Sequence, residues 1–234
     1  MRIAALCLLL LLRCPPPSAG SAEITAADLM ERMPDLIGSV PEPPEITEDQ
    51  VMALEEDDPE THIFINRALA RPPRPARLGG DGRLRLIRPD TREKISAAYR
   101  RPDGSYDREE LERLDRLLRC RFTGKHAEMP VRLIEILDAV EDRFGGRPLV
   151  VMSGYRTPAV NKHVPGAARW SLHMLGWAAD IRIAGTPTED IARFAAGLKT
   201  GGVGHYPDSG FVHIDAGRAR RWEKRGRSAG MAGS

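Results

Sequence analysis

The hydrophobic positions of this chain follow the spacing of strands in some segments and of helices in others, from about Arg83 onward. Short stretches that alternate between apolar and polar residues, or form a brief apolar run beside turn residues, predict β-strands. Six stretches meet this description: residues 83–89, 94–100, 148–156, 177–183, 202–206 and 211–215. The first two can pair with each other. The last two flank the turn sequence PDSG, so we expect a hairpin there.

Three longer segments repeat apolar residues with the period of an α-helix: residues 105–119, 129–146 and 186–202. Ser105 or Asp107 is suited to cap the first helix, because either side chain can accept a hydrogen bond from the first turn. Pro130 fits the first turn of the second helix, and Gly145 fits its end. Residues 186–189 (TPTE) predict a capping box for the third. Together these elements predict an α+β fold with a mainly antiparallel sheet and helices on one face.

The first 22 residues have a different character. An early arginine, an apolar run over residues 3–12 and a stretch of proline and small residues are the layout of a secretory signal peptide. The apolar run is too short to form a stable membrane span. Lipidation at Cys14 is an alternative for this segment, although Arg13 stands where a small residue is expected. Without the segment Cys120 is the one cysteine left, so we expect an exported protein, secreted or periplasmic, without an internal disulfide bond.

Residues 23–80 are acidic at first and then rich in proline and arginine. Between Glu23 and Glu60 there are 13 acidic residues and one basic residue. Such a composition buries little apolar surface, so we expect a flexible extension that is helical only locally. A folded domain over residues 81–226 and a flexible tail over residues 227–234 follow it. The net charge of +2 and the aromatic content of 5% argue against a nucleic-acid-binding protein.

Candidate chemistry lies in the last strands and just before them. Strand alternation puts His213 on the same face as Phe211 and Asp215, and it places Asp180 on a strand whose opposite face is apolar. A carboxylate beside the core is costly unless a cation or hydrogen-bond donors compensate it. With His173, these side chains provide two imidazoles and one carboxylate, a ligand set of the kind that catalytic zinc uses. The spacing alone is also compatible with a capping histidine and a salt-bridged aspartate.

Four motifs, in this order, resemble YcbK/MepK-like murein endopeptidases: SGYRTPAVN, SLHMLGWAADIRI, GGVGHYP and FVHIDAGRARRW. That family is similar to VanX-like D-Ala-D-Ala dipeptidases and to the hedgehog signalling domain, with which it forms the LAS group of zinc metallopeptidases. The similarity runs from about Arg83 to Trp222 and leaves the acidic extension outside. The resemblance implies a hedgehog/D-Ala-D-Ala peptidase-like fold and one zinc ion, Zn²⁺, with His173, Asp180 and His213 as the metal ligands.

The resemblance also implies roles for residues around these ligands. The arginine of the S-G-Y-R turn is Arg156, which in relatives binds and polarises the substrate near the scissile carbonyl. Ser171 supports the loop of His173 by a hydrogen bond. Gly176 lets the chain turn tightly between that ligand and the following strand.

The chain departs from VanX-like relatives at Gly210, where they carry an acidic general base three residues before the last histidine. Three other residues are candidates for handling the proton. Asp215 lies on the face of the last ligand, where it can also orient that ligand. Asp208 lies in the turn before it, and His205 lies in the preceding strand.

The resemblance therefore implies an exported enzyme, a zinc metallopeptidase that hydrolyses peptide bonds in peptidoglycan stem peptides or cross-links. It can be a murein endopeptidase or a carboxypeptidase, because the sequence leaves the cleaved bond and the oligomeric state open. Peptidoglycan peptides of the bacterial cell envelope are the expected partners. The alternative is a catalytically silent zinc-containing module that binds the cell wall or a protein, since the hedgehog domain shares the fold.

Overall fold

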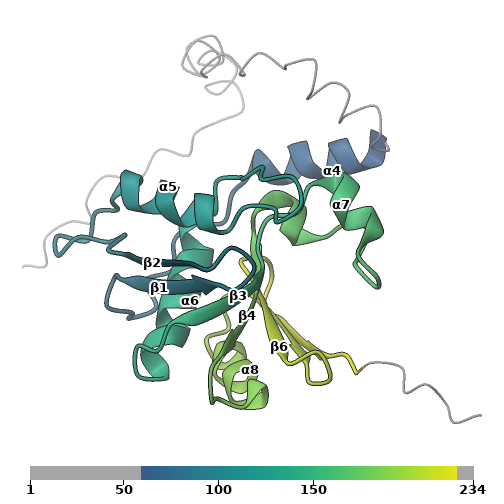
Figure 1. Cartoon of the computed structure of the whole chain (residues 1–234). Coiled ribbons are helices and arrows are strands. Elements are labelled where there is room, and N and C mark those ends of the chain that lie inside the picture. Colours follow the sequence, from purple (N-terminus) through teal and green to yellow (C-terminus); the bar gives the residue numbers. More distant parts are fainter. Residues whose placement is uncertain (1–58, 226–234) are drawn as a thin grey trace, which may run out of the picture. The chain divides into compact units, whose positions relative to one another are not determined.

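A seven-stranded sheet forms the centre of the computed structural model, which describes residues 59–225, all within one compact unit (Figure 1). The strands lie in the order β2-β1-β3-β4-β6-β5-β7. Their bounds are Leu84–Arg88 (β1), Glu93–Ala97 (β2), Leu149–Ser153 (β3), Ala178–Ile183 (β4), Gly202–Tyr206 (β5), Phe211–Asp215 (β6) and Arg220–Glu223 (β7). Neighbouring strands are antiparallel except for β1/β3 and β5/β7, which are parallel. The expected β1/β2 pair and β5/β6 hairpin are confirmed.

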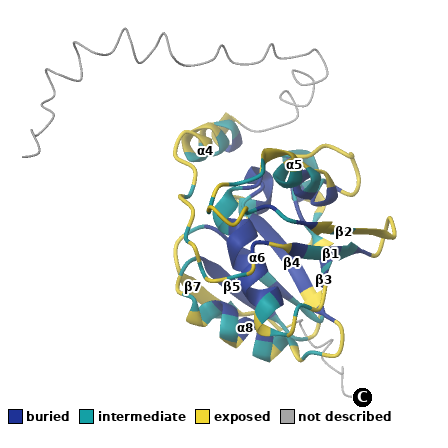
Figure 2. Ribbon diagram, turned by 90° about the vertical axis from the view of Figure 1, so that its left-hand side faces the viewer, coloured by how far each residue is buried: buried dark blue, intermediate teal, exposed yellow. Residues whose placement is uncertain are grey.

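The helices are α4 (Pro59–Leu69), α5 (Arg108–Leu117), α6 (Val131–Arg143), α7 (Pro158–His163) and α8 (Thr188–Gly197), with a short 3₁₀ helix, η1 (Leu172–Leu175). Helix α6 packs on β1 and β6, and α8 packs beside it on β4, β5 and β6 (Figure 2). Their apolar side chains and those of the facing strands form the hydrophobic core. The α+β fold, with a mainly antiparallel sheet and helices on one face, is confirmed.

Alternation along the central strands separates this core from a second face. Ile181 pairs with Val212, and both are buried on the side of α6 and α8. Asp180 pairs with His213, and these two side chains point to the opposite face. The sheet therefore carries apolar packing on one side and polar chemistry on the other.

Caps define the first two predicted helices. Asp107 caps α5, since its side chain accepts a hydrogen bond from the backbone N–H of Glu110 at 3.2 Å, and Ser105 is not the cap. Pro130 directly precedes α6. Gly145, two residues beyond the end of α6, has a φ of 80°, a conformation that glycine adopts without strain.

The capping box expected for α8 is wrong. Pro187 precedes the helix and contributes no side-chain hydrogen bond. Thr188 is the first helical residue, and its hydroxyl forms a hydrogen bond with the His205 ring at 3.0 Å instead. Helices α4 and α7, the 3₁₀ helix η1 and strand β7 are additions that the sequence pattern did not predict.

The segment before β1 lies along α6 and does not extend freely. The backbone N–H groups of Ala76 and Arg77 donate to Glu135 Oε2 at 2.5 and 3.0 Å. Gly82 N donates to Asp138 Oδ2 at 3.0 Å. These contacts dock the segment against α6 by its backbone, within the range over which the sequence predicts a flexible extension.

The expected signal peptide over residues 1–22, with Cys14, and the expected tail over residues 227–234 lie outside the described residues, as do residues 23–58 of the acidic extension. Within residues 59–225, no helix has the length and apolar character that a membrane span requires.

Candidate metal centre and active site

Three separate elements present the histidines and the aspartate that the sequence singles out. His173 lies in η1, Asp180 in β4 and His213 in the neighbouring strand β6. Ser171 caps η1 by accepting a hydrogen bond from His173 N at 3.3 Å. Gly176 ends η1 with a φ of 70°, which turns the chain into β4. The local roles expected for the serine and the glycine therefore match the structure.

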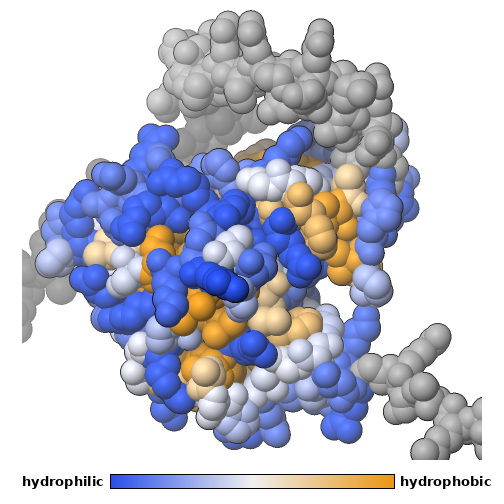
Figure 3. Space-filling view, viewed as in Figure 1, coloured by the Kyte–Doolittle hydropathy of each residue, from blue (hydrophilic) through white to orange (hydrophobic). Residues whose placement is uncertain are grey.

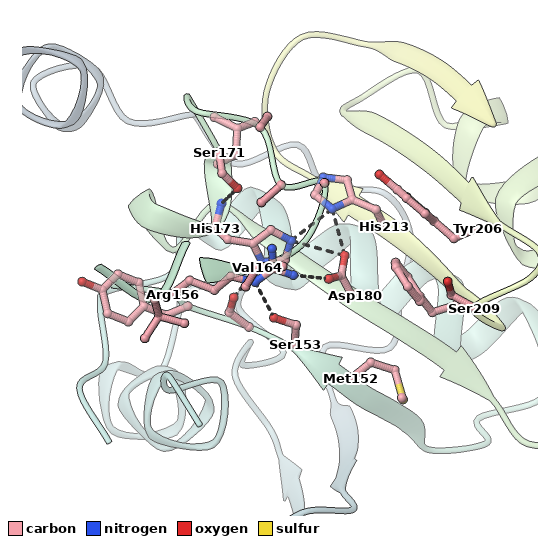
Figure 4. Close-up of a pocket in the computed structure, with 18 of the residues that line it drawn as sticks. Met152, Ser153, Arg156, Val164, Ser171, His173, Asp180, Tyr206, Ser209 and His213 are labelled. Carbon is pink, nitrogen blue, oxygen red and sulfur yellow. Dashed lines mark hydrogen bonds and ion pairs between the residues drawn. The ribbon is translucent and has the colours of Figure 1, made fainter. Parts of the chain in front are cut away.

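The ring nitrogens and one carboxylate oxygen converge on a common point (Figure 4). His173 Nε2 lies 3.2 Å from Asp180 Oδ1 and 3.1 Å from His213 Nδ1. His213 Nδ1 lies 2.9 Å from the same carboxylate oxygen. His173 and Asp180 are buried, and His213 is nearly so. The structure thus brings together all three predicted metal ligands.

The remaining nitrogen of each imidazole is held by an acceptor. His173 Nδ1 lies 2.7 Å from the carbonyl oxygen of Gly154, which can only accept, so this nitrogen carries the proton. His213 Nε2 lies 3.1 Å from Asp215 Oδ2 and donates to that carboxylate in the same way. Each ring therefore turns its other nitrogen, Nε2 of His173 and Nδ1 of His213, toward Asp180.

Two imidazole nitrogens and one carboxylate oxygen consequently meet at one point, an arrangement that needs positive charge among them, from a bound proton or from a metal cation. The pKa values reflect the same demand. Burial alone would raise the pKa of Asp180, but the two histidines hold it well below its usual range. Burial alone would lower the pKa of His213, but hydrogen bonds to Asp180 and Asp215 raise it above its ordinary value. Burial lowers the pKa of His173, which keeps that ring neutral. Two nitrogens and one oxygen in this arrangement suit zinc.

Arg156 holds the second oxygen of the candidate ligand carboxylate. Its Nη2 donates to Asp180 Oδ2 at 2.6 Å, and its Nε donates to Ser153 Oγ at 2.9 Å. Its backbone N–H donates to the carbonyl oxygen of His173 at 3.1 Å. One residue thus ties the loop after β3 to two of the three candidate ligands.

The three candidates for proton handling lie in different places, and none of them lines the pocket beside the cluster. Asp215 is fully buried and contacts His213 through Nε2, the ring nitrogen that points away from the cluster. His205 lies on the opposite face of the sheet, between Thr188 and Glu223. Asp208 is an exposed turn residue. This placement favours a positioning role for Asp215.

The cluster opens into a pocket of about 630 Å³. Among the described residues that line it, Asp180 is the one acidic residue. Exposed Phe122, Met152 and Trp170 contribute apolar surface to the pocket. Hydrophobic side chains are likewise grouped among hydrophilic ones on the face shown in Figure 3. The basic residues that line the pocket are Arg88, Arg119, Arg121, Arg156, Arg220, Lys224 and Arg225. Five of them form ion pairs that balance part of this positive charge: Arg88 with Asp90, Arg119 with Glu93, Arg156 with Asp180, Arg220 with Asp215 and Arg225 with Glu223.

Sequence reasoning misses two residues that line the pocket from β7, Arg220 and Trp222. Both stand in the motif FVHIDAGRARRW, two positions apart. Their spacing was the signal that could have identified them, because two residues that are two positions apart in a β-strand point to the same face.

Comparison with known proteins places these features in a family. A family model described as "Peptidoglycan L,D-endopeptidase MepK" matches residues 79–222. The "Probable peptidoglycan L,D-endopeptidase MepK" of Haemophilus influenzae is 33% identical over 140 residues, which cover 57% of this chain and 75% of that protein. The "Peptidoglycan L,D-endopeptidase MepK" of Escherichia coli K12 is 36% identical over 137 residues, covering 56% and 75%. The chain belongs to the peptidoglycan L,D-endopeptidase MepK family.

Proposed function

We propose that this member of the peptidoglycan L,D-endopeptidase MepK family hydrolyses peptide bonds in peptidoglycan with one zinc ion held by His173, Asp180 and His213. The convergence of three electron-pair donors, each fixed by a second contact, is the observation that carries this proposal. A zinc ion bound there would act as a Lewis acid and activate water for attack at neutral pH.

The residues around the cluster divide the remaining tasks. Arg156 keeps Asp180 charged and oriented by donating to Asp180 Oδ2. Its Nη1 can donate to the substrate oxygen that becomes negative during attack, which is the electrostatic role expected from the resemblance. Asp215 orients the His213 ring and does not receive the proton of the attacking water, because it lies beyond the ring.

The charge of the pocket supports a peptidoglycan substrate. Stem peptides carry free carboxylates, and the described residues that line the pocket include seven basic side chains and one acidic one, with five of the seven also in ion pairs. The apolar side chains Phe122, Met152 and Trp170 can contact the uncharged part of such a peptide. We place the enzyme in the cell envelope, where its substrate lies. The relatives' names favour cleavage within an L,D cross-link over the carboxypeptidase alternative.

One observation favours a second function, a zinc-containing module that binds the cell wall without cleaving it. Within residues 59–225, Asp180, itself a candidate ligand, is the one acidic residue that lines the pocket, so this part of the chain places no other carboxylate there to act as general base. Catalysis then requires a base from the substrate or a water chain.

Incubation of the zinc-loaded protein with intact cross-linked muropeptides separates the two functions. The proposed enzyme yields products whose masses identify the cleaved bond. Absence of product from fully zinc-loaded protein supports the binding module instead.

The ligand assignment has its own test. We expect the variants His173→Ala and His213→Ala to bind less than one zinc ion per chain, which metal analysis of the purified proteins measures. His126→Ala is the matched control, because His126 is exposed and does not line the pocket. Full zinc retention in both site variants would rule the assignment out.

A further inference from the structure

Strand β7 reaches the candidate metal centre across an intervening strand. The sheet order β6-β5-β7 leaves β5 between the strand of His213 and β7. Two rows of aligned residues cross these strands. Gly202 pairs with Asp215 on one side and Arg220 on the other, and Gly204 pairs with His213 and Trp222. Each row therefore has a glycine in the middle.

The two glycines leave the space through which the side chains of β7 pass. A Cβ atom on Gly202 would collide with both Asp215 Oδ2 and Arg220 Nη1. A Cβ atom on Gly204 would lie 2.5 Å from the Trp222 ring, which is closer than a real contact allows. Any larger residue at these positions would separate β7 from β6 on this face.

Arg220 uses this gap to hold both oxygens of Asp215. Its Nη1 donates to Oδ1 at 3.1 Å and its Nη2 donates to Oδ2 at 2.7 Å. Asp215 is fully buried, whereas the Arg220 side chain is 46% exposed. The fork geometry of a guanidinium fixes a carboxylate in orientation as well as in charge. The same Oδ2 accepts the hydrogen bond from His213 Nε2.

Trp222 supports the same arrangement from the next row. Its ring centre lies 5.3 Å from that of His213, and the Arg220 guanidinium lies 4.9 Å from the Trp222 ring. Side chains from β7 therefore contact His213 both directly and through Asp215.

We propose that Arg220 is a positioning residue of the metal centre. It fixes Asp215, which in turn fixes the His213 ring with Nδ1 toward His173 and Asp180. This inference rests on the proposed function in one respect, that His213 is a metal ligand. It adds a chain of contacts, Arg220 to Asp215 to His213, through which β7 sets the affinity for the metal.

Zinc affinity in the absence of substrate tests the proposal, because a role of Arg220 in substrate binding does not affect it. Arg220→Met keeps an aliphatic stem over Trp222 and removes the donors. We expect zinc binding, measured by competition with a chromophoric chelator, to weaken by about 10–100-fold. Arg221→Met is the matched control, since Arg221 neighbours Arg220 on β7 but does not line the pocket.

Two further variants exclude a merely structural effect. If Arg220 acts through Asp215, then Arg220→Met should add little to the loss already caused by Asp215→Asn, so the effects are non-additive. Arg220→Lys keeps the charge without the fork, and it should bind zinc several-fold less tightly than the unmodified protein. It also decides the matter if Arg220→Met does not fold.

The possible outcomes are distinct. Unchanged zinc affinity in folded Arg220→Met, or in Arg220→Lys if the former does not fold, overturns the proposal. Losses that simply add in the double variant overturn it as well. A protein that binds zinc tightly through His213 but hydrolyses no muropeptide contradicts the proposed function and leaves the role of Arg220 intact. The cobalt(II) form adds a spectroscopic readout, since its visible absorption should change in Arg220→Met and not in Arg221→Met.

Discussion

Buried carboxylates occur on both sides of the sheet, and the molecule compensates their charge in two different ways. On the face of the candidate site, Asp180 and Asp215 contact imidazole and guanidinium groups. On helix α6, Glu135, Asp138 and Glu141 are equally buried, but they accept hydrogen bonds from backbone N–H groups of residues 76–85. Glu141 and Glu135 also face guanidinium groups, since Arg85 donates to Glu141 at 2.8 Å and Arg100 lies 3.7 Å from Glu135. Asp138 differs from the acids of the site, because its hydrogen bonds come from the Tyr99 hydroxyl and the Gly82 N–H group.

The pKa shifts of the two groups differ accordingly. Burial tends to raise the pKa of Asp180, Asp215, Asp138 and Glu141, but His213 and Arg220 hold the pKa of Asp215 below its usual range. On α6, burial prevails over the bonds from Tyr99 and Gly82 and raises the pKa of Asp138 to about 6. Burial raises the pKa of Glu141 too. Asp215, which holds a candidate ligand, thus faces an imidazole and a guanidinium, while Asp138 accepts from a neutral hydroxyl and a backbone N–H group.

The comparison predicts that replacing aspartate by asparagine weakens zinc binding at Asp180 but not at Asp138. Asp180→Asn keeps the shape of the side chain but removes the charged ligand. Since loss of a partner behind a ligand already costs about 10–100-fold in metal affinity, loss of the ligand should cost more than about 100-fold. Asp138→Asn should bind zinc and hydrolyse muropeptides like the unmodified protein. Chelator competition and product analysis measure both, and equal losses would show that the two groups are not functionally separate.

Complete removal of an α6 carboxylate should instead affect stability. Asp138→Ala leaves the Tyr99 hydroxyl and the Gly82 N–H group without their acceptor. Each unsatisfied buried donor costs about 1–3 kcal/mol, so we expect the loss of the acceptor for both to lower the free energy of unfolding by about 2–6 kcal/mol. Urea denaturation measures the change.

Asp142→Ala provides the control for this substitution. Asp142 Oδ2 accepts from Asp81 N, but that bond is exposed to solvent, so its loss should cost less than about 1 kcal/mol. A similar loss of stability in both variants would show that burial of Asp138 is not the cause.

The candidate site was more predictable than the support on α6, for physical reasons. His173, Asp180 and His213 stand in motifs of specific spacing, and strand alternation orients two of them. The partner of Asp215 was not predictable, because Arg220 reaches it across β5 and only the strand order shows which residues are aligned. The general-base candidates His205 and Asp208 were chosen by nearness in sequence, which does not reveal the face or the exposure of a side chain.

The packing of the segment before β1 was hidden for a different reason. Hydrophobic periodicity predicts α6 well, but it assigns Glu135, Asp138 and Glu141 to the polar, solvent-facing side. In the structure the segment from Ala76 to Arg85 covers these acids. Few apolar side chains dock this segment, so its proline- and arginine-rich composition indicated flexibility. Contacts made by backbone N–H groups leave no pattern in a sequence.

Truncation tests whether residues 71–79 belong to the folded domain. A chain starting at residue 71 lacks α4 but keeps the N–H groups of Ala76 and Arg77, and it should be about as stable as one starting at residue 59. A chain starting at residue 80 loses both donors to buried Glu135. We expect it to lose about 1–3 kcal/mol of stability. Equal urea midpoints for the three chains would restore the simpler prediction that the entire extension is dispensable.

The smallest expected effect is a difference in how stability depends on pH, measured on metal-free protein so that zinc release does not contribute. The folded state raises the pKa of Asp138 to about 6, from an ordinary value near 3.8. Folded protein therefore binds this proton more tightly than the unfolded chain, and the resulting stabilisation is complete below about pH 4 and lost as the pH rises through about 6. The free energy of unfolding of the unmodified protein, relative to Asp138→Asn, should thus decrease between about pH 4 and pH 7.

Asp215 should show the opposite dependence on pH, because its pKa is lowered in the folded state. Its contribution to stability is present above about pH 4 and is lost as the pH falls through the folded-state value, which the comparison with Asp215→Asn detects. Urea midpoints of the three proteins measure both differences when the pH series extends from below about pH 4, where Asp215 titrates, up to about pH 7. Slopes of the same sign for Asp138 and Asp215 would contradict the division of the buried acids into two groups.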